Sequence, residues 1–448
     1  MRIHLIAIGG SAMHNFALAL SHLGHEVTGS DDQIFEPSRG RLKDAGLLPE
    51  EGWDENRITS SIDVIILGMH ARTDNPELLK AQKLGLNIQS YPEFLYNATS
   101  SKKRIVVGGS HGKTTITSML LHSMSKSGIN TDYMVGAQLK GFNRMLELRN
   151  DNEYAVIEGD EYLSSPIDRR SKFLHYRPHV AIITGIAWDH INVFPTEESY
   201  LDTFRAFIDT IEPNGTLVYC NEDNQLNELV SEFHAKRRDI NFIPYSTPSS
   251  TPGDTFSTVE FEDGSTLNTP LVGSHNYQNL EGAKSICSAI GIKASDFLST
   301  INDFKGAARR LEVITEKDGF VAFRDFAHAP SKLKATQAGV VGSYPNRNVT
   351  AVFELHTFSS LNKDFLPQYV DSMNSVDNAI VYYDPAVVEH KRLPAISPKE
   401  VVTAFNRADI EVITSVKTLE ERIKAIPSEN HCVLLMSSGM FGGAEMPF

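Results

Sequence analysis

Short apolar runs alternate with amphipathic segments along the 448 residues of the chain. Runs rich in Ile and Val, at 3–8, 64–67 and 180–184, have the length of buried β-strands. Between such runs, segments such as 13–23 and 75–84 repeat apolar residues at the spacing of an amphipathic helix. This alternation predicts βαβ units with parallel sheets. The other expected strands are 26–29, 87–89, 105–107, 155–157, 216–219, 321–324, 350–354, 379–383, 411–413 and 433–436.

The expected elements fall into three sets. A charged and polar stretch at 97–104 separates the first set from the second, and the third set begins near Glu312. Between Tyr245 and Gly264 the composition shifts to Ser, Thr, Pro and Gly, which predicts an antiparallel addition with an edge strand at 257–261. We therefore predict an α/β protein of three domains, comprising residues 1–99, 100–310 and 311–448.

The overall composition narrows the class of protein. With 41% hydrophobic and 22% charged residues the sequence is that of an ordinary globular protein, and its formal net charge of −14 argues against general nucleic-acid binding. The three cysteines lie far apart without a C-x-x-C pair, which fits a reducing compartment. Because there is no run of about 18 apolar residues and polar residues interrupt the N-terminal stretch, we expect neither a membrane span nor a signal peptide, and predict a cytoplasmic protein.

A glycine-rich turn follows the expected strand at 105–107. It reads Gly108-Gly-Ser-His-Gly112 and leads into Lys113 and Thr114 at the start of a helical pattern. The usual phosphate-binding loop, G-x-x-x-x-G-K-[ST], has its first glycine where this chain has Val107. Glycines nevertheless let the backbone approach a phosphate, and the free amides of a helix start attract anions. The pattern predicts a nucleotide site in which Lys113 reaches the phosphates and Thr114 a Mg²⁺ ion, rather than a glycine turn beside a surface lysine.

Acidic residues follow the expected strand at 155–157. Glu158, Asp160 and Glu161 lie at its carboxyl end, where parallel strands carry side chains into the ligand crevice. Since Mg²⁺ takes few protein oxygens and keeps several waters, one or two of these carboxylates would suffice to hold it. The pair Asp189–His190 follows the next expected strand and is a second candidate for the metal site. Taken alone, such an acidic cluster is more often a solvated turn, and a lone histidine is usually structural.

Six short motifs occur along this chain, and together they are specific enough to indicate a protein family. They are Gly109–Thr115, Glu158–Glu161, Asp189–His190, Gly273–Asn279, Arg309–Glu312 and Asp325–Pro330. Their order and spacing resemble those of the Mur ligases, the ATP-dependent amide ligases of peptidoglycan synthesis, over nearly the whole chain. The phosphate loop of that family has the same shorter glycine spacing.

The resemblance implies an architecture and a set of ligands. It implies a Rossmann-like N-terminal domain for a UDP-sugar, a central P-loop-type ATPase domain and a Rossmann-like C-terminal domain for the incoming amine. It also implies ATP and Mg²⁺ as cofactors, with UDP-N-acetylmuramate and an amino acid or peptide as substrates. We expect a monomer or weak homodimer without nucleic-acid or membrane partners.

The resemblance further implies a role for individual residues. Lys113 and Arg310 are expected to contact the phosphates and to be catalytic. Glu158 and His190 are expected to hold metal ions together with Thr114, and are likewise assigned to catalysis. The residues expected around the nucleotide, with the asparagines facing adenine and the aspartate the ribose, are Gly109, Ser110, His111, Gly112, Lys113, Thr114, Thr115, His275, Asn276, Asn279, Arg310 and Asp325. The residues expected at the other substrates are Gly9, Gly10, Ser11, Ala12, Met13, Ser30, Asp31, His70 and His328.

The segment from Asp160 to Pro178 distinguishes branches of the family. Ligases that add L-alanine pass more directly from the acidic motif to the next strand, whereas the longer D-x-R-S-K-F-x-H-Y-R-P form present here resembles the murein peptide ligase branch. That branch attaches the tripeptide L-alanyl-γ-D-glutamyl-meso-diaminopimelate to UDP-N-acetylmuramate in peptidoglycan recycling. We expect this reaction, through an acyl phosphate, with addition of L-alanine in de novo peptidoglycan synthesis as the alternative.

Two single positions and one stretch depart from the family pattern. Gly185 stands where the family usually has Asn, and Leu163 where the peptide-adding branch usually has Asp. The stretch 353–359 reads F-E-L-H-T-F-S in place of the branch's F-E-P-R-S-N-T, which bears on the amine substrate and not on the ATP chemistry. No lysine lies between His190 and Arg205, so the carbamylated lysine of some other branches is not expected.

Other functions fit the sequence less well. A dinucleotide site would use Asp31, about twenty residues after Gly10, but Ala7–Ala12 lacks the first and third glycines of G-x-G-x-x-G. Ligation of folate or of amino-acid polymers by the same ATPase core does not fit the first domain, in which the glycine loop 6–13 and the stretch 27–31 resemble the branch of the family that takes UDP-N-acetylmuramate. A further alternative is a protein that binds a nucleotide but has lost catalysis. Its only support is Gly185, which replaces the asparagine usual in the family.

Overall fold

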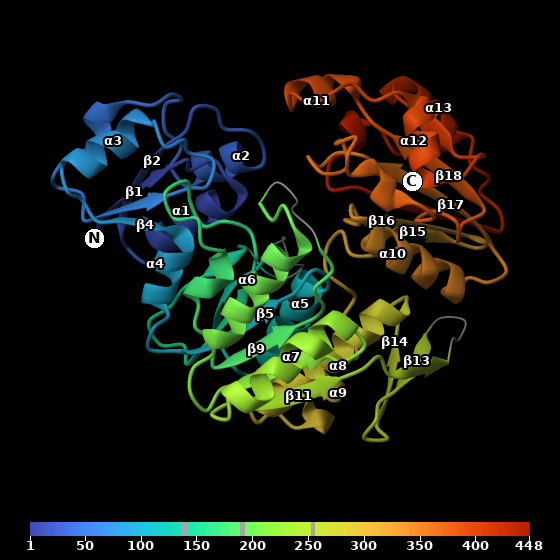
Figure 1. Ribbon diagram of the computed structural model, residues 1–448, viewed down its shortest axis with the longest axis horizontal. Helices are drawn as coiled ribbons and strands as arrows, with labels where there is room; N and C mark the ends of the chain where they lie inside the picture. Colours follow the sequence, from blue (N-terminus) through green and yellow to red (C-terminus); the bar gives the residue numbers. More distant parts are fainter. Residues whose placement is uncertain (137–141, 143, 189–192, 252–255) are drawn as a thin grey trace. The chain divides into compact units, whose positions relative to one another are not determined.

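The structure is a computed structural model that describes residues 1–136, 142, 144–188, 193–251 and 256–448. The chain forms two compact units. The first comprises Met1–Ile186, Pro195–Tyr245 and Gly282–Ile301, and the second comprises Ala187–Phe194, Ser246–Glu281 and Asn302–Phe448. A four-stranded and a seven-stranded sheet belong to the first unit, and a three-stranded and a six-stranded sheet to the second (Figure 1).

The first unit begins with a parallel sheet in the strand order β2-β1-β3-β4. The Ile and Leu side chains of β1 and β3 are almost fully buried, as expected for central strands of a parallel sheet. Asn75 and Ser90 cap α3 and α4 with their side chains, and a proline follows in each first turn. The elements are β1 (Arg2–Ile6), α1 (Ser11–His22), β2 (Glu26–Ser30), α2 (Ser38–Asp44), the 3₁₀ turn η1 (Glu55–Arg57), β3 (Val64–Leu67), α3 (Pro76–Lys83), β4 (Ile88–Ser90) and α4 (Tyr91–Ala98).

The seven-stranded sheet has the strand order β11-β10-β9-β5-β8-β6-β7. Neighbouring strands are parallel except β6 and β7. Its strands are β5 (Lys103–Gly108), β6 (Thr131–Met134), β7 (Leu146–Glu147), β8 (Tyr154–Glu158), β9 (Val180–Ile183), β10 (Thr216–Cys220) and β11 (Asn241–Tyr245). The associated helices are α5 (Lys113–Lys126), η2 (Lys172–His175), α6 (Glu197–Asp209), α7 (Asn224–Lys236) and α9 (Ala294–Ile301), while α8 (Ser274–Ala289) begins in the second unit and ends in the first.

Three short antiparallel strands form a sheet in the order β12-β13-β14. They are β12 (Ser249–Thr251), β13 (Ser257–Glu260) and β14 (Thr266–Thr269). The predicted antiparallel addition is confirmed, but the prediction of an edge strand at 257–261 is wrong, because β13 pairs on both sides. Val259 is buried while Thr258 and Glu260 are exposed, and such alternation reports which face of a strand is covered, not how many neighbours it has.

The six-stranded sheet has the strand order β15-β16-β20-β17-β18-β19. β15 and β16 form an antiparallel hairpin, and the other neighbours are parallel. Val321 and Phe323 enter one apolar cluster, and Phe320 and Ala322 enter another, so apolar packing covers both faces. The elements are β15 (Glu312–Lys317), β16 (Phe320–Asp325), α10 (Pro330–Ser343), β17 (Asn348–Glu354), η3 (Leu366–Tyr369), β18 (Asn378–Tyr382), α11 (Pro385–His390), α12 (Pro398–Phe405), β19 (Glu411–Ile413), α13 (Val416–Lys424), β20 (His431–Met436) and η4 (Phe441–Gly443).

The predicted alternation of strands and helices is confirmed. Each expected strand is present, with ends that differ by at most about two residues, within the usual uncertainty of element boundaries. β6, β7, β11, β12, β14 and β15 were not predicted. β11 contains Pro244, which lacks a ladder donor and is tolerated because β11 lies at the sheet edge. Within the described ranges no helix has the length and apolarity that a membrane crossing requires.

Candidate active site

The predicted phosphate loop joins β5 to α5, and Gly109 in this loop lies where a side chain cannot fit. Gly109 has a φ of +120°, and a Cβ there would lie 2.2 Å from the hydroxyl oxygen of Thr184. Gly112 adopts a left-handed conformation just before α5, where no described side chain caps the helix. The Ser110 amide donates to the Gly185 carbonyl at 2.9 Å, which fastens the turn to the end of β9. The first amides of α5 are thus suited to an anion.

Lys113 is the first residue of α5 and lies between the loop and the acidic motif. Its ammonium donates to the Gly109 carbonyl at 2.6 Å and to the Glu161 carboxylate at 2.7 Å. Burial acts to lower the pKa of Lys113, but the negative charges of Glu161, Asp160 and Glu158 outweigh burial and raise the pKa above its usual value. Lys113 is therefore a fixed cation beside the loop that the sequence assigns to phosphate.

Glu158 ends β8, the strand that pairs with β5. Its carboxylate accepts hydrogen bonds from the Thr114 hydroxyl at 2.9 Å and from the Gly136 amide at 2.7 Å. The hydroxyl at the start of α5 and the carboxylate at the end of β8 thus meet at the carboxyl ends of two neighbouring parallel strands. Both groups are hard oxygen donors, and Mg²⁺ needs few of them because it keeps waters. The residues present therefore fit a magnesium ion beside the phosphate loop.

The two other carboxylates of the acidic motif are held by lysines. Glu161 pairs with Lys113, and Asp160 pairs with Lys172 at 2.5 Å. Across the described ranges, no group of three or more His, Cys, Asp and Glu side chains is arranged to hold a metal ion. The pair Asp189–His190, predicted for the metal site, lies outside the described residues.

Lys172 is a functional candidate that the sequence analysis did not single out. It belongs to η2, within the segment 160–178, and its ammonium lies 5.6 Å from the ring centre of Tyr91 and 5.7 Å from that of Tyr162. Burial acts to lower the pKa of Lys172, but its acidic neighbours, Asp160 foremost among them, together raise the pKa above its usual value. The signal that could have found this residue is its place in the D-x-R-S-K-F stretch that follows the acidic motif.

Gly185 follows β9, and its lack of a side chain has a steric reason. Its φ is +150°, and a Cβ there would lie 2.8 Å from Cε1 of His111 and 3.2 Å from the carboxylate of Asp223. Asp223 is fixed in turn, because it accepts from the Ile186 amide at 2.8 Å and caps α7. The asparagine usual in the family would require the His111 ring to move. Glycine at position 185, where the family usually has asparagine, is therefore explained by the close packing of this residue against His111 of the phosphate loop.

The glycine loop of the first sheet lies between β1 and α1. The Gly9 amide donates to the Asp31 carboxylate at 2.7 Å, and a Cβ on Gly9 would come within 2.9 Å of the same oxygen. Asp31 is buried, and burial raises its pKa to about 6. Because this carboxylate is directed at the amide of its own loop, it is not presented to a ribose, which argues against the dinucleotide alternative.

The other residues predicted to bind the sugar substrate surround the same loop. Ser11 is exposed and Ala12 partly exposed at the start of α1, whereas Met13 is buried. His70 is exposed, and its ring lies 3.8 Å from a Cβ built on Gly10. The Ser30 hydroxyl donates to the buried carboxylate of Glu77 and therefore faces the interior. The assignment of these positions to substrate stays a prediction.

In the second unit, the residues predicted for adenine and ribose lie in segments that interact. Asn276 and Asn279 are buried near the start of α8, and a Cβ on Gly339 of α10 would lie 3.2 Å from the His275 ring. Burial lowers the pKa of His275, opposed by the charge of Asp325. The Asp325 carboxylate accepts hydrogen bonds from the chain itself, namely from the amides of Leu311 and Ala327 and the hydroxyl of Thr336. It thereby holds the loop at the end of β16.

Arg309 and Arg310 both lie over the ring of Phe326, at 5.1 and 4.7 Å from its centre. Arg309 also donates to the carbonyls of Ser437 and Gly439, which follow β20. His328 lies two residues beyond Phe326, with Nδ1 2.9 Å from the Phe326 carbonyl oxygen. Arg309 is thus tied to its own sheet, and the roles predicted for Arg310 and His328 stay predictions.

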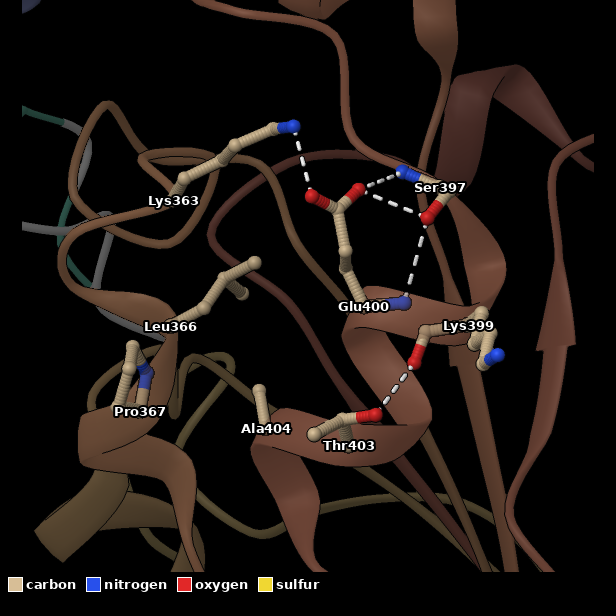
Figure 2. Close-up of a pocket in the computed structure, with 8 residues that line it drawn as sticks. All are labelled: Lys363, Leu366, Pro367, Ser397, Lys399, Glu400, Thr403 and Ala404. Carbon is tan, nitrogen blue, oxygen red and sulfur yellow. Dashed lines mark hydrogen bonds and ion pairs between the residues drawn. The ribbon is translucent and has the colours of Figure 1, made fainter.

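A separate cavity of about 360 Å³ lies beside α12 in the second unit (Figure 2). On its rim Lys363 pairs with Glu400 at 2.7 Å, and Glu400 forms a capping box with Ser397 at the start of α12. Its apolar lining comes from η3 and α12. Lys363 and Glu400 thus stabilise the start of α12. None of the site residues predicted from the sequence lines this cavity.

Models of one protein family match the chain along three consecutive stretches. "Mur ligase family, catalytic domain" matches residues 2–103, "Mur ligase middle domain" residues 107–287 and "Mur ligase, glutamate ligase domain" residues 309–439. Among curated proteins, the UDP-N-acetylmuramate–L-alanine ligase of Caldicellulosiruptor saccharolyticus is 30% identical, over 98% of this chain and 96% of its own length.

Solved structures of two kinds of ligase are similar to the chain. A murein peptide ligase from Psychrobacter arcticus is 26% identical with a TM-score of 0.69, over 99% of this chain and 97% of that one. The UDP-N-acetylmuramate–alanine ligase of Thermotoga maritima is 19% identical with a TM-score of 0.74, over the same shares, which shows the fold.

The predicted fold class is confirmed, with a mixed α/β structure of parallel sheets that matches the three family models in order. Members of this family are ligases that use ATP and form ADP. With matches along the whole chain and a relative that is 30% identical over nearly its full length, the chain belongs to the Mur ligase family, the ATP-dependent ligases of peptidoglycan synthesis.

Proposed function

We propose that this ligase joins UDP-N-acetylmuramate to the tripeptide L-alanyl-γ-D-glutamyl-meso-diaminopimelate. The observation that carries the proposal is the segment 160–178, whose sequence resembles the peptide-adding branch. In the structure this segment is an ordered part of the acidic motif, because Lys172 within it pairs with Asp160 and its amide donates to the Tyr162 carbonyl at 2.9 Å. The 26% identity to a murein peptide ligase along almost the whole chain supports the same branch.

The first step of the proposed reaction activates the substrate carboxylate. A carboxylate oxygen attacks the γ-phosphorus of ATP, the bond from that phosphorus to ADP breaks, and an acyl phosphate forms. Two anions must approach each other, so positive charge at the γ-phosphate lowers the barrier. Lys113 supplies it from the start of α5, where the helix amides also attract phosphate, and we assign Arg310 to the same phosphate.

Magnesium has a place in this proposal because the residues fit it. Thr114 and Glu158 would hold the ion, and His190 would hold a second one. When bound, the ion neutralises phosphate charge and polarises the phosphoryl group. The chain's own contribution is to fix the two oxygen donors 2.9 Å apart before the nucleotide arrives.

The second step transfers the acyl group to the amine. The amine nitrogen attacks the acyl carbon, the bond from carbon to phosphate breaks, and the amine loses a proton. We assign the amine to the carboxyl ends of β17 and β20, since parallel sheets bind ligands at that edge. There Glu354 accepts from the Phe441 amide at 2.8 Å and lies 3.6 Å from Nδ1 of His356. A carboxylate with a half-exposed imidazole suits an ammonium or a proton acceptor.

Addition of L-alanine is the second candidate, and a specific feature favours it. His356 stands where the peptide-adding pattern has an arginine, so a guanidinium that could bind a peptide carboxylate is replaced by an imidazole beside Glu354. The curated relative from Caldicellulosiruptor saccharolyticus, which is 30% identical, is named as an L-alanine ligase.

A panel of amines decides between these candidates. The full chain is incubated with UDP-N-acetylmuramate, ATP, Mg²⁺ and either the tripeptide, L-alanine, L-alanyl-γ-D-glutamate or glycine, and phosphate release and the ligated product are measured. The proposal expects kcat/KM at least about tenfold higher for the tripeptide than for L-alanine. Turnover with free L-alanine and none with the tripeptide would reverse the assignment, and phosphate release without any ligated product would reject ligation of these amines.

A further inference from the structure

The ammonium groups of Lys113 and Lys172 lie beside the acidic motif, and each forms an ion pair with one of its carboxylates. Lys113, from the phosphate loop, pairs with Glu161 at 2.7 Å, and Lys172, from η2, pairs with Asp160 at 2.5 Å. The side chains of Lys113 and Glu161 are 15% and 2% exposed, so water screens their attraction little. In the other pair Lys172 is 13% exposed and Asp160 is 37% exposed, so water screens that attraction more. Glu158, by contrast, accepts from uncharged donors, the Thr114 hydroxyl among them.

In the pair of Lys172 and Asp160, the lysine is packed into the fold while the carboxylate is partly exposed. The Lys172 ammonium lies over the rings of Tyr91 and Tyr162, and Tyr91, from α4, is buried. The backbone also joins the two partners, because the amide of Phe173 donates to the carbonyl of Asp160 at 3.2 Å. The position of the ammonium is therefore set from three sides before any ligand binds.

Asp160 lies two residues beyond Glu158, at the end of the same strand. If it were free, it would add a second carboxylate to the oxygen donors beside the phosphate loop. Affinity for a divalent cation rises with the number of carboxylates in the site, so the ion would bind without a nucleotide and in a different coordination. We propose that Lys172 is a positioning residue that withholds Asp160 from the cation. Glu158 and Thr114 would then hold Mg²⁺ only in the presence of the nucleotide.

This inference rests on the proposed function in one respect, namely that a magnesium nucleotide binds at the phosphate loop. Its test is a titration of the full chain with Mn²⁺ in the absence of nucleotide, in which free Mn²⁺ is measured by electron paramagnetic resonance. Lys172→Met is expected to bind Mn²⁺ about tenfold more tightly than the wild type, because it removes a cation and releases the Asp160 oxygen that Lys172 holds, while the other oxygen still accepts from the Tyr162 amide. Asp160→Asn and the double variant Lys172→Met/Asp160→Asn are expected to bind as weakly as the wild type.

A matched control separates release of Asp160 from a general change in charge. Arg170→Met removes a cation that pairs with Asp168 at 2.8 Å, two residues from Lys172, and is expected to leave Mn²⁺ affinity within about twofold of the wild type. Lys172→Arg should keep binding weak. If Lys172→Met melts at a lower temperature, Lys172→Gln, which keeps a polar group toward Asp160, gives the second test.

The outcomes distinguish the inference from the proposed function. Wild-type Mn²⁺ affinity in folded Lys172→Met and Lys172→Gln would overturn the inference, as would tight binding that persists in the double variant or that also arises in Arg170→Met. The titration uses neither UDP-sugar nor amine. Tight binding confined to the Lys172 variants, combined with no ligation of any amine by the wild type, would therefore reject the proposed function and leave the inference standing.

Discussion

The Thr114 hydroxyl donates to the Glu158 carboxylate across 2.9 Å, between residues 44 positions apart in the chain. This bond joins the start of α5 to the end of β8 and brings the predicted phosphate loop and the acidic motif into contact. Neither motif carries a metal-nucleotide site by itself: the loop offers amides, a lysine and a hydroxyl, and the strand end offers the carboxylate. Their meeting follows from the direct pairing of β5 with β8 in a parallel sheet.

Removing either partner of this hydrogen bond is expected to weaken the binding of Mg²⁺ and to slow the reaction with ATP. In Thr114→Val and Glu158→Gln one oxygen donor is lost or loses its charge, while the shape of the side chain is kept. We expect kcat/KM for ATP to fall by about 10² or more, and the Mg²⁺ concentration for half-maximal rate to rise. Phosphate release measured across a magnesium series checks this, with Thr114→Ser as the control that restores the hydroxyl. A rate in Thr114→Val close to that of Thr114→Ser would contradict the assignment.

Replacing Lys113 by alanine is expected to abolish ligation and preserve the fold. The side chain contacts the loop carbonyl of Gly109 and one carboxylate, so its removal takes away the charge at the phosphates and leaves the packing of α5 largely intact. Less than a tenth of the wild-type rate should remain, given the usual effect of about 10² or more for such a group. Lys126→Ala, at an exposed position near the end of the same helix, serves as the control. Ligation by Lys113→Ala at more than a tenth of the wild-type rate would contradict the role assigned to Lys113.

The phosphate loop and the acidic motif could be predicted because their chemistry is local. Glycines, a lysine and a threonine stand together at 109–115, and carboxylates follow directly on a strand-forming run. The distribution of charges within the motif could not be predicted in the same way. Lys172 lies 12 residues after Asp160, and its choice of partner depends on the path of η2 and on Tyr91 from another helix. Likewise, the Ser30 side chain faces the interior because its hydroxyl donates to Glu77, a residue 47 positions away in the sequence.

The elements of the fold were predicted where apolar runs are continuous, and missed where pairing is the main stabilisation. β9 and β10 are fully buried and read clearly from the sequence. β12 is exposed throughout and is defined by its hydrogen bonds to β13, a partner that no local pattern specifies. For the same reason the position of β13 between two neighbours could not be distinguished from an edge.

Gly185 is expected to tolerate no side chain without loss of stability. At φ +150° a non-glycine residue is strained, and a Cβ would press on the His111 ring. Gly185→Ala should therefore lower the free energy of unfolding by about 1–3 kcal/mol and weaken ATP binding through the displaced loop. Gly342→Ala in α10, where a Cβ would meet no atom within 4 Å, is the control and should be neutral or slightly stabilising. Equal thermal stability of Gly185→Ala and the wild type would contradict the steric account.

Asp31 is expected to make the stability of the first sheet depend on pH. Its pKa is raised from 3.8 to about 6, chiefly by burial, so the folded protein holds this proton more tightly than the unfolded chain does. The resulting stabilisation is fully present below the unfolded value and is lost as the pH rises through about 6. Asp31→Asn keeps an acceptor for the Gly9 amide and cannot ionise. The wild type should therefore lose stability relative to Asp31→Asn between about pH 4 and pH 7, by at most about 3 kcal/mol.

Denaturant unfolding of both proteins across that pH range, at constant ionic strength, measures the difference directly. Asp44→Asn, at an exposed position of α2, is the matched control and should follow the wild type at every pH. A difference between the wild type and Asp31→Asn that stays constant with pH would mean that the carboxylate is ionised at no cost. The hydrogen bond from Gly9 would then offset the burial of its charge, and the glycine loop would hold a permanent negative charge instead of one that is lost on acidification.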